Sequence, residues 1–299
     1  MRPLIKYLSY WAIIVRAWSL PMTAASVLLS AAYAYYLGYV VYLGPLALTL
    51  VGALVLHMSV NVLNDYYDYV YGFDRPDVLT YRPHAILMGI LKPRAMLNLG
   101  MALIITGSLI GIYLFLIAGL PVLITGALGL VLLYGYTGPP LKLKYRALGE
   151  LAVFTTWGPL MAIGSMAAST LGHINYLVIA AVTPVALLVV ATLYANNVRD
   201  AVRDREGGAV TIAAILGDKA RWLYAALVVG SYVAQLTMVF MGALPTATLL
   251  TLATTLNAAG MVSKAMRNSF ERLDEATARF SLLYAALMIA GLIISKIGM

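Results

Sequence analysis

Long stretches without a charged residue dominate the pattern along the chain. Asp, Glu, Lys and Arg are absent from 17–64, 95–141, 151–198 and 222–263, which are 48, 47, 48 and 42 residues long. A helix needs about 20 apolar residues to cross a bilayer, so each stretch can hold two spans. Turn-forming residues near the middle of each, such as AGLP at 118–121, predict four helical hairpins. A shorter uncharged stretch, 280–295, adds a ninth span.

The charged residues predict the orientation of these spans. Of the 20 Lys and Arg residues, 19 lie in the first 16 residues or in the four segments that separate the uncharged stretches, and all 12 acidic residues lie in those segments. Basic residues accumulate on the cytoplasmic side of membrane proteins. We therefore expect an all-α integral membrane protein, one domain over residues 1–299, with nine transmembrane helices, a cytoplasmic N-terminus and the C-terminus outside. A signal peptide cleaved near AYA (32–34) is the alternative for the first span.

Composition agrees with this class and narrows the chemistry. The chain is 62% hydrophobic and 11% charged, which is typical of a multi-pass protein of the cell membrane. Its net charge of +8 could suggest a nucleic-acid partner. Because the basic residues follow the loops between spans, we expect the lipid bilayer as partner and no nucleic acid. The absence of cysteine excludes disulfides, thiolate chemistry and iron–sulfur ligation.

Two polar clusters end predicted spans on the cytoplasmic side. In NVLNDYYD (61–68), Asn61, Asn64, Asp65 and Asp68 are spaced by three and four, which predicts one shared helix face. Asp74 follows Gly72, beyond the expected end of that helix. In YANNVRDAVRD (194–204), Asn196, Asp200 and Asp204 are spaced by four, and Asn197 precedes Asp200 by three. An acidic residue within a membrane span is costly and marks a functional site, whereas a lone Asp at a helix end can be a solvated cap.

The residue types favour a hard cation. Carboxylates that share a site repel one another unless positive charge compensates them. Oxygen ligands from Asp and Asn, without His or Cys, suit Mg²⁺, which commonly keeps substrate phosphate oxygens in its coordination shell. Two Mg²⁺ ions between the two clusters would therefore hold a diphosphate. Basic residues near the clusters could bind its oxygens, although the orientation rule alone could explain them: Arg75, Arg82, Lys142, Lys144, Arg146, Arg199 and Arg203.

Four segments together resemble a known family. NVLNDYYDYVYGFD (61–74), YTGPPLKLKYRALGE (136–150), WGPLMAIGS (157–165) and ANNVRDAVRDREGGAVTIAAILG (195–217) resemble, in order and spacing, the UbiA superfamily of intramembrane prenyltransferases. The branch that prenylates 1,4-dihydroxy-2-naphthoate in menaquinone synthesis is the most similar. RAWSLPMTAASVLLS (16–30) and LDEATARFSLLYAALMIAGLI (273–293) fit the same branch, so the likeness covers nearly the whole chain.

The resemblance implies nine helices around a central cavity, with cytoplasmic Asp motifs that bind Mg²⁺ and the diphosphate of an isoprenoid donor. By position, it assigns metal binding to Asn64, Asp65, Asp68, Asp74, Asn197, Asp200 and Asp204, and a place near the diphosphate to Arg16, Arg82, Lys144 and Arg199. We expect Asp65, Asp68, Asp200 and Asp204 to be the catalytic residues. The chain departs from the branch at Ala209, where a Lys usually follows the glycine pair.

The function that these features predict is transfer of an isoprenyl group from a prenyl diphosphate to an aromatic acceptor. Ionisation to an allylic cation, followed by attack of an electron-rich ring, needs no covalent nucleophile. Within the family, a glyceryl-lipid phosphate, 4-hydroxybenzoate, homogentisate or a tetrapyrrole is an alternative acceptor. An ion-coupled transporter is the alternative from another class, but a transporter is expected to keep charges near the bilayer midplane.

Overall fold

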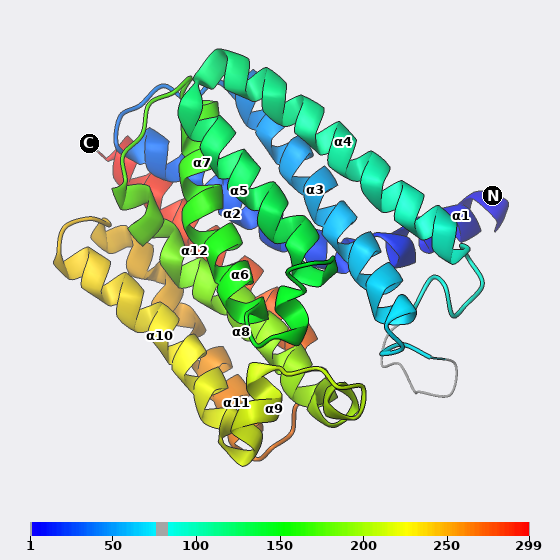
Figure 1. Ribbon diagram of the computed structural model, residues 1–299. Helices are drawn as coiled ribbons and strands as arrows, with labels where there is room; N and C mark the ends of the chain where they lie inside the picture. The colour runs from blue at the N-terminus through cyan, green and yellow to red at the C-terminus, as the bar shows by residue number, and fades with distance from the viewer. Residues whose placement is uncertain (1, 76–82, 299) are drawn as a thin grey trace.

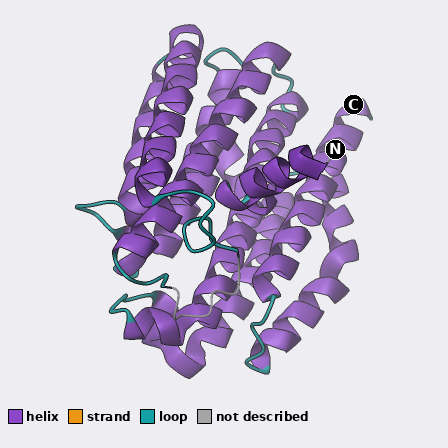
Figure 2. Cartoon of the chain, turned by 90° about the vertical axis from the view of Figure 1, so that its right-hand side faces the viewer, coloured by secondary structure: helices purple, strands orange, loops and turns teal. Residues whose placement is uncertain are grey.

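The computed structural model describes residues 2–75 and 83–298, and within this part of the chain every regular element is a helix (Figures 1 and 2). The one β-type pairing in the described residues is an isolated bridge between Arg146 and Val210. This confirms the all-α class that the uncharged stretches predict.

The first half contains four long helices, α2 to α5, and one helical segment, α6–η3–α7, that is interrupted by a π-helical turn. Its elements are α1 (Arg2–Ile14), η1 (Ala17–Ser19), α2 (Leu20–Tyr36), α3 (Leu43–Val70), α4 (Pro93–Ala118), α5 (Leu120–Thr137), η2 (Leu143–Tyr145), α6 (Gly149–Thr155), η3 (Thr156–Leu160) and α7 (Met161–Ser169). The chain bends by 62° between α1 and α2, at Arg16, whose backbone is left-handed with a φ of 50°. The rod α6–η3–α7 contains a π-helical turn at η3, with Pro159 inside it.

The second half continues with α8 (Leu177–Glu206), α9 (Ile212–Leu216), η4 (Gly217–Lys219), α10 (Ala220–Phe240), η5 (Thr246–Thr254), α11 (Thr255–Met266) and α12 (Leu273–Ile297). Helix α8 lies inside the bundle and packs against α10, α12 and α2. Helices α3 and α4 form an antiparallel pair on another side, which is visible in the upper right of Figure 1. The segment α2, for which sequence allows a cleaved signal, contributes the fully buried residues Val27, Leu29 and Tyr33 to the core.

Seven helical segments of the described chain are long and apolar enough to cross a membrane, or eight if the bent pair α1–α2 forms one span. These correspond to eight of the nine expected spans. The remaining expected span, in 222–263, is divided into the 3-10 helix η5 and the short helix α11. A multi-pass membrane protein is thus supported, while the ninth span and the sides of the two termini stay predictions.

Buried hydrogen bonds explain the break at η5. Gln235 of α10 donates from Nε2 to the carbonyl oxygen of Thr248 at 2.7 Å, and the Thr251 hydroxyl donates to Gln235 Oε1 at 2.7 Å. Tyr284 of α12 donates to the same Oε1. A backbone carbonyl that bonds to a side chain, and threonines that bond back to carbonyls three residues earlier, compete with regular α-helical pairing. The tighter 3-10 form results.

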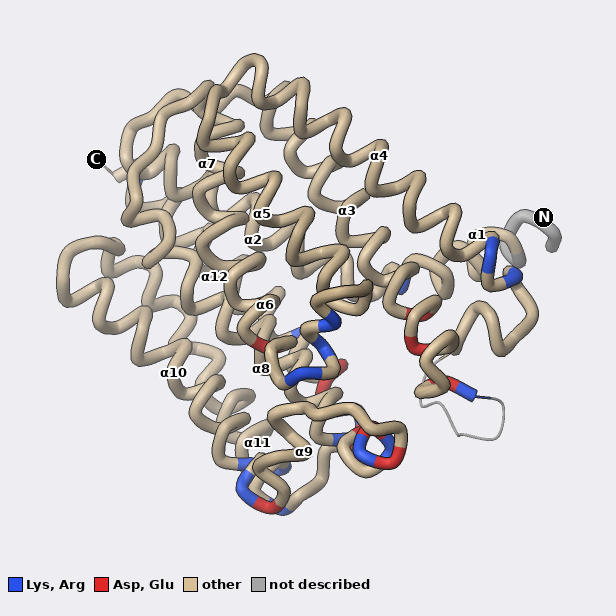
Figure 3. Tube along the Cα trace, viewed as in Figure 1, with Lys and Arg blue, Asp and Glu red and all other residues tan. Residues whose placement is uncertain are grey.

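Charged residues gather at one end of the bundle. Figure 3 shows Asp, Glu, Lys and Arg around the ends of α3 and α8, the short elements that follow them, and α11, whereas the opposite helix ends are almost entirely uncharged. The fold therefore brings the two polar clusters of the sequence to the same end.

Candidate active site

A cavity of about 760 Å³ lies among α2, α3, α5, α7 and α8. Its deeper wall is largely apolar and includes Leu56, Ile110, Leu132, Leu133 and Leu160. Its charged end contains most of the expected site residues: Arg16, Asn64, Asp68, Lys144, Asn196, Asn197, Arg199, Asp200, Arg203 and Asp204. The two polar clusters thus line one end of a single cavity, and the rest of its wall is largely apolar.

Asp68 is the centre of the first cluster. Lys144 Nζ lies 2.6 Å from Asp68 Oδ2 and also donates to Asn64 Oδ1 at 3.1 Å. Asn64 Nδ2 donates to Asp68 Oδ2 at 3.0 Å, one helical turn apart on α3, as the spacing of four predicts. The Tyr145 hydroxyl donates to Asp68 Oδ1 at 2.7 Å. Asp68 is buried at 3% exposure, so these donors replace the water that the carboxylate loses on folding.

Asp65 lies on another side of α3 from Asn64 and Asp68. It is fully buried, does not line the cavity and forms an ion pair with Arg16. This differs from the single face that sequence spacing suggests. Adjacent residues are about 100° apart around a helix with 3.6 residues per turn, so Asp65 cannot point in the same direction as Asn64. The bend at Arg16 brings the guanidinium to Asp65, and Arg16 also lines the cavity.

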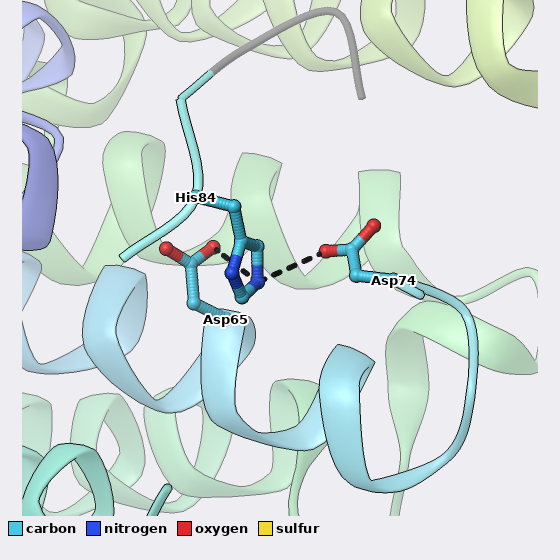
Figure 4. Close-up of side chains that lie close together, drawn as sticks. All are labelled: Asp65, Asp74 and His84. Atoms are coloured by element: carbon cyan, nitrogen blue, oxygen red, sulfur yellow. Dashed lines mark ion pairs between the residues drawn. The ribbon is translucent and has the colours of Figure 1, made fainter. Parts of the chain in front are cut away.

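His84, which sequence reasoning missed, connects Asp65 with Asp74 (Figure 4). Its Nε2 lies 3.3 Å from Asp74 Oδ2 and 4.0 Å from Asp65 Oδ1. Asp74 follows Gly72, whose φ of +80° lies in a left-handed turn after the end of α3, which is where the sequence predicts that the helix ends. One ligand atom from each of Asp65, Asp74 and His84 lies within 4.8 Å of the others, a spacing that could hold a metal ion.

The hydrogen bonds of His84 favour a donor over a metal ligand. The backbone N–H of Leu87 donates to His84 Nδ1 at 3.3 Å. A ring nitrogen that accepts a hydrogen bond carries no proton, so the proton of the neutral imidazole is on Nε2. Nε2 then carries the proton and has no lone pair for a metal. It lies 3.3 Å from Asp74 Oδ2 without hydrogen-bond geometry, so His84 stands between two buried carboxylates as an N–H group available to either. The signal for it in the sequence is weak, because PHA (83–85) lies outside the helices and has no helical spacing.

Asp200 is the centre of the second cluster. Arg199 Nε lies 3.1 Å from Asp200 Oδ1, and Arg203 Nη2 lies 3.0 Å from Asp200 Oδ2. Arg199 reaches on to Asp274 of α12, with Nη1 at 2.7 Å from Asp274 Oδ2. Asn196, Asp200 and Asp204 all line the cavity, which agrees with the stripe that their spacing of four predicts. Two guanidinium groups are thus held beside the carboxylates at the cavity wall.

Glu150 is a second residue that sequence reasoning missed. It is buried at 7% exposure at the start of α6, and Asn197 Nδ2 donates to its Oε1 at 2.9 Å. That bond fixes the orientation of the Asn197 amide. The sequence gives no signal for this contact, because Glu150 and Asn197 are 47 residues apart and meet only when α6 packs beside α8.

The two clusters are electrostatically connected. The Asp204 carboxylate lies close enough to Lys144, Asp200 and Asp68 to interact electrostatically with all three charges. Lys144 lies in η2, between α5 and α6, and so places a positive charge between a carboxylate of α3 and one of α8. This arrangement compensates part of the negative charge that gathers at the cavity mouth.

Two expected basic residues lie away from the cavity, and a third is not among the described residues. Lys142 does not line the cavity, and its Nζ lies 3.9 Å above the ring of Tyr71 in a cation–π contact. Arg75 is exposed and outside the cavity wall. Arg82 lies outside the described residues. Ala209, where the family usually has Lys, is buried at 5% exposure and bonds its N–H to Asp204 O at 2.8 Å.

The residues at the cavity fit Mg²⁺. Within residues 2–75 and 83–298, the Asp204 carboxylate has no hydrogen bond or ion pair, and Asn197 Oδ1 accepts no hydrogen bond. Both are oxygen donors that line the cavity, and such donors suit a hard cation. Asp68 differs because Lys144 and Tyr145 already contact both of its oxygens.

Tyr145 keeps its proton in this environment. Burial and then the negative charge of Asp68 raise the pKa of the Tyr145 hydroxyl above its ordinary value. A neutral phenol is a hydrogen-bond donor, so its contact with Asp68 persists over the physiological pH range.

Comparisons with known proteins agree with this geometry. The profile described as the UbiA prenyltransferase family matches residues 23–289. The chain belongs to this family. A 1,4-dihydroxy-2-naphthoate octaprenyltransferase of Mycobacterium tuberculosis is 32% identical over 238 residues, which are 79% of this chain and 79% of that protein. A similar octaprenyltransferase of Bacillus subtilis is 31% identical over 65% of this chain and 62% of its own length.

Solved structures of the family have the same fold. The apo structure of a UbiA homolog from Aeropyrum pernix K1 superposes with a TM-score of 0.69, at 20% identity, over 93% of this chain and 96% of that chain. A UbiA homolog from Archaeoglobus fulgidus bound to GPP and Mg²⁺ superposes with a TM-score of 0.61, at 13% identity, over 95% of this chain and 99% of that chain. The cavity thus lies in the fold of a family of prenyltransferases.

Proposed function

We propose that the protein transfers an isoprenyl group from a prenyl diphosphate to an aromatic acceptor of the 1,4-dihydroxy-2-naphthoate type, in lipoquinone biosynthesis. The observation that carries this proposal is the cavity itself, in which two Asp and Asn clusters from α3 and α8 meet at one end and apolar side chains continue from them. A diphosphate needs the charged end, and a prenyl tail needs the apolar wall. The two parts of the donor thus match the two parts of the space.

The proposed place of the diphosphate is between Asp68 and Asp200. Magnesium would supply the positive charge that diphosphate oxygens require. We propose two ions, which would be bound by Asn64, Asp68, Asn197, Asp200 and Asp204. Asp65 and Asp74 are outlying members of this set. The homolog from Archaeoglobus fulgidus, which was solved with GPP and Mg²⁺, supports the choice of donor and ion.

The proposed reaction begins with cleavage of the allylic C–O bond, whose electron pair stays on the diphosphate oxygen. Lys144, Arg199 and Arg203 line the cavity and would stabilise that charge as it develops. The Arg guanidinium offers two parallel N–H donors to a phosphate, whereas the Lys ammonium acts as a point charge. Arg16, held by Asp65, supplies a further donor group at the cavity wall.

The second step joins the allylic carbon to a ring carbon of the acceptor, and the ring then loses one proton. The apolar wall would keep water away from the allylic cation, which water would otherwise trap as an alcohol. Relatives that are called 1,4-dihydroxy-2-naphthoate octaprenyltransferases support this type of acceptor. We place the protein in the cell membrane with the site toward the cytoplasm, from the positions of the charged residues.

The experiment that tests this proposal uses the purified full chain in detergent. A radiolabelled prenyl diphosphate is incubated with Mg²⁺ and, in parallel, with 1,4-dihydroxy-2-naphthoate, 4-hydroxybenzoate, homogentisate, a tetrapyrrole or a glyceryl-lipid phosphate. We expect a prenylated naphthoate product that disappears on chelation of Mg²⁺. No prenyl product with any acceptor would overturn the function, and a product with another acceptor alone would overturn the acceptor type.

A further inference from the structure

A group of uncharged polar side chains lines the cavity next to the first Asp cluster and includes Asn61 from its start. Ser19 of η1, Thr23 of α2, His57 and Asn61 of α3, and Trp157 of η3 all line the cavity. Asn61 precedes Asn64 by one turn of α3, which is about 4.5 Å along the helix axis. None of the five carries a fixed charge, so they do not repeat the chemistry of the diphosphate end.

The Asn61 amide is fixed in position and offers one unused acceptor. Its Nδ2 donates to the carbonyl oxygen of Val15 at 3.0 Å and to the Ser19 hydroxyl at 2.9 Å. These two bonds determine which end of the amide is nitrogen. Within residues 2–75 and 83–298, Oδ1 accepts no hydrogen bond. Asn61 lines the cavity, so a ligand O–H or N–H could reach this oxygen and would gain a hydrogen bond there.

The Trp157 indole forms an aromatic wall with an unused donor. The ring of His57 meets it edge to face, with centroids 5.0 Å apart and an angle of 80° between the planes. His57 is itself held by the Thr23 hydroxyl, 2.8 Å from Nδ1, and by the Ser19 hydroxyl, 3.3 Å from Nε2. Trp157 Nε1 is buried and has no hydrogen-bond partner in the described chain. Asn61 and Trp157, which both line the cavity, thus each have a polar atom without a hydrogen-bond partner in the described chain.

The backbone beneath Trp157 is also unusual. The turn Thr156–Leu160 is π-helical, and Gly158 has a φ of −92° and a ψ of −105°, which are not helical values. Single π-turns inside helices are rare and occur frequently at functional sites. This turn reorients the side chains of η3 relative to those of α6 and α7. It therefore presents Trp157 to the cavity independently of the hydrogen bonds around His57 and Asn61.

We propose that Asn61 and Trp157 bind the acceptor ring and that His57 is a positioning residue for Trp157. The site selects a hydroxylated aromatic compound whose O–H donates to Asn61 Oδ1. This inference rests on the transferase function proposed above. The aromatic ring packs against the indole. An acceptor that carried a phosphate would need a free cationic group here; the five side chains carry no charge, and neighbouring Arg16 is already paired with Asp65. The site thus favours a phenolic acceptor over a glyceryl-lipid phosphate.

The test compares ligands before it compares variants, because a ligand change cannot unfold the protein. Binding of 1,4-dihydroxy-2-naphthoate and of its 1,4-dimethoxy analogue is measured by tryptophan fluorescence quenching on the full chain in detergent, without donor or Mg²⁺. The ether keeps the ring and lacks the O–H donors. We expect the dihydroxy compound to bind about tenfold more tightly to the wild-type protein, which is a typical effect of one buried hydrogen bond.

The variant Asn61→Leu completes the comparison. It should bind both ligands equally, and in the transfer assay it should raise KM for the acceptor about tenfold while KM for the prenyl diphosphate changes less than about twofold. Trp157→Phe should also raise KM for the acceptor. Trp222→Phe, which changes an exposed indole on α10, is the control and should bind like the wild type.

Equal binding of the two ligands by the wild-type protein, or the same preference in Asn61→Leu, would overturn this site. The binding measurement needs no turnover, so it separates the two proposals. Discrimination between the ligands without any prenyl product supports the acceptor site and contradicts the transferase. Prenyl product without discrimination supports the transferase and contradicts the acceptor site.

Discussion

Lys144 and Asp68 are 76 residues apart in the chain, and their side chains form an ion pair of 2.6 Å at the cavity wall. Lys142, two residues earlier, lies against Tyr71 instead. The 3-10 turn η2 produces this difference, because it directs successive side chains to different sides. Sequence alone gives both lysines the same role.

The first prediction follows from this contrast. Lys144→Met removes a positive charge from the proposed diphosphate site, and we expect kcat/KM for prenyl transfer to fall about 10²-fold, as for other lost transition-state charges. Lys142→Met removes the same charge outside the cavity and should lower kcat/KM less than about threefold. Steady-state kinetics of the two variants with Mg²⁺ measure the difference. Equal losses would contradict the placement of Lys144 at the leaving group.

How far sequence reasoning reaches depends on how local the cause is. Helical geometry predicts the stripe of Asn196, Asp200 and Asp204, and the conformational freedom of glycine predicts the turn at Gly72. The structure has both features. The uncharged stretches likewise locate eight apolar spans, counting the bent pair as one. Each of these features is determined within a few neighbouring residues.

Features that depend on distant residues were not predictable. His84 became part of the site because its ring lies beside Asp65 and Asp74, and Glu150 because α6 packs beside α8. The 3-10 form of η5 depends on Gln235 and Tyr284, which belong to other helices. Asn64 and Asp68 line the cavity, whereas Asp65 at the edge of that face turns toward Arg16, a partner 49 residues away; its role in the site stays a prediction.

The second prediction concerns His84. His84→Leu replaces the polar imidazole beside the buried carboxylates of Asp65 and Asp74 with an apolar side chain, so we expect the free energy of unfolding to fall by about 1–3 kcal/mol. His84→Gln places an amide N–H near the same position and should recover part of that loss. Thermal unfolding in detergent gives the order wild type, Gln, Leu. A Gln variant no more stable than the Leu variant would argue against the donor role of His84.

The third prediction uses the pH dependence of Tyr145. Its pKa is raised in the folded state, so the folded protein keeps this proton at a pH at which an unfolded chain begins to lose it. The contribution of the hydroxyl is therefore fully present below the unfolded pKa of about 10 and declines above it. We expect Tyr145→Phe to have a lower melting temperature than the wild type by a constant amount from pH 6 to 9. The difference should narrow above about pH 10. Narrowing already between pH 6 and 9 would contradict the assignment.

The fourth prediction concerns the side on which the chain ends. If the chain has nine spans and a cytoplasmic N-terminus, Met299 lies on the side of the membrane opposite the cytoplasm. A reporter enzyme that is active only outside the cytoplasm, fused after Met299, should therefore be active. The same reporter inserted after Arg205, in the charged end of the bundle, is the control and should be inactive. Activity of the control alone would refute both the nine-span count and the cytoplasmic site.

The most direct test of the central claim is a double-mutant cycle on the transfer reaction. If Asp68 and Asp200 hold one diphosphate together, removing either should abolish most of the same function, because residues that act as a unit have non-additive effects. We measure kcat/KM of Asp68→Asn, Asp200→Asn and the double variant with Mg²⁺, a prenyl diphosphate and 1,4-dihydroxy-2-naphthoate. The account predicts a loss of about 10³-fold or more for each single variant and little further loss for the double. Full activity in either single variant, or losses that multiply in the double variant, would contradict it.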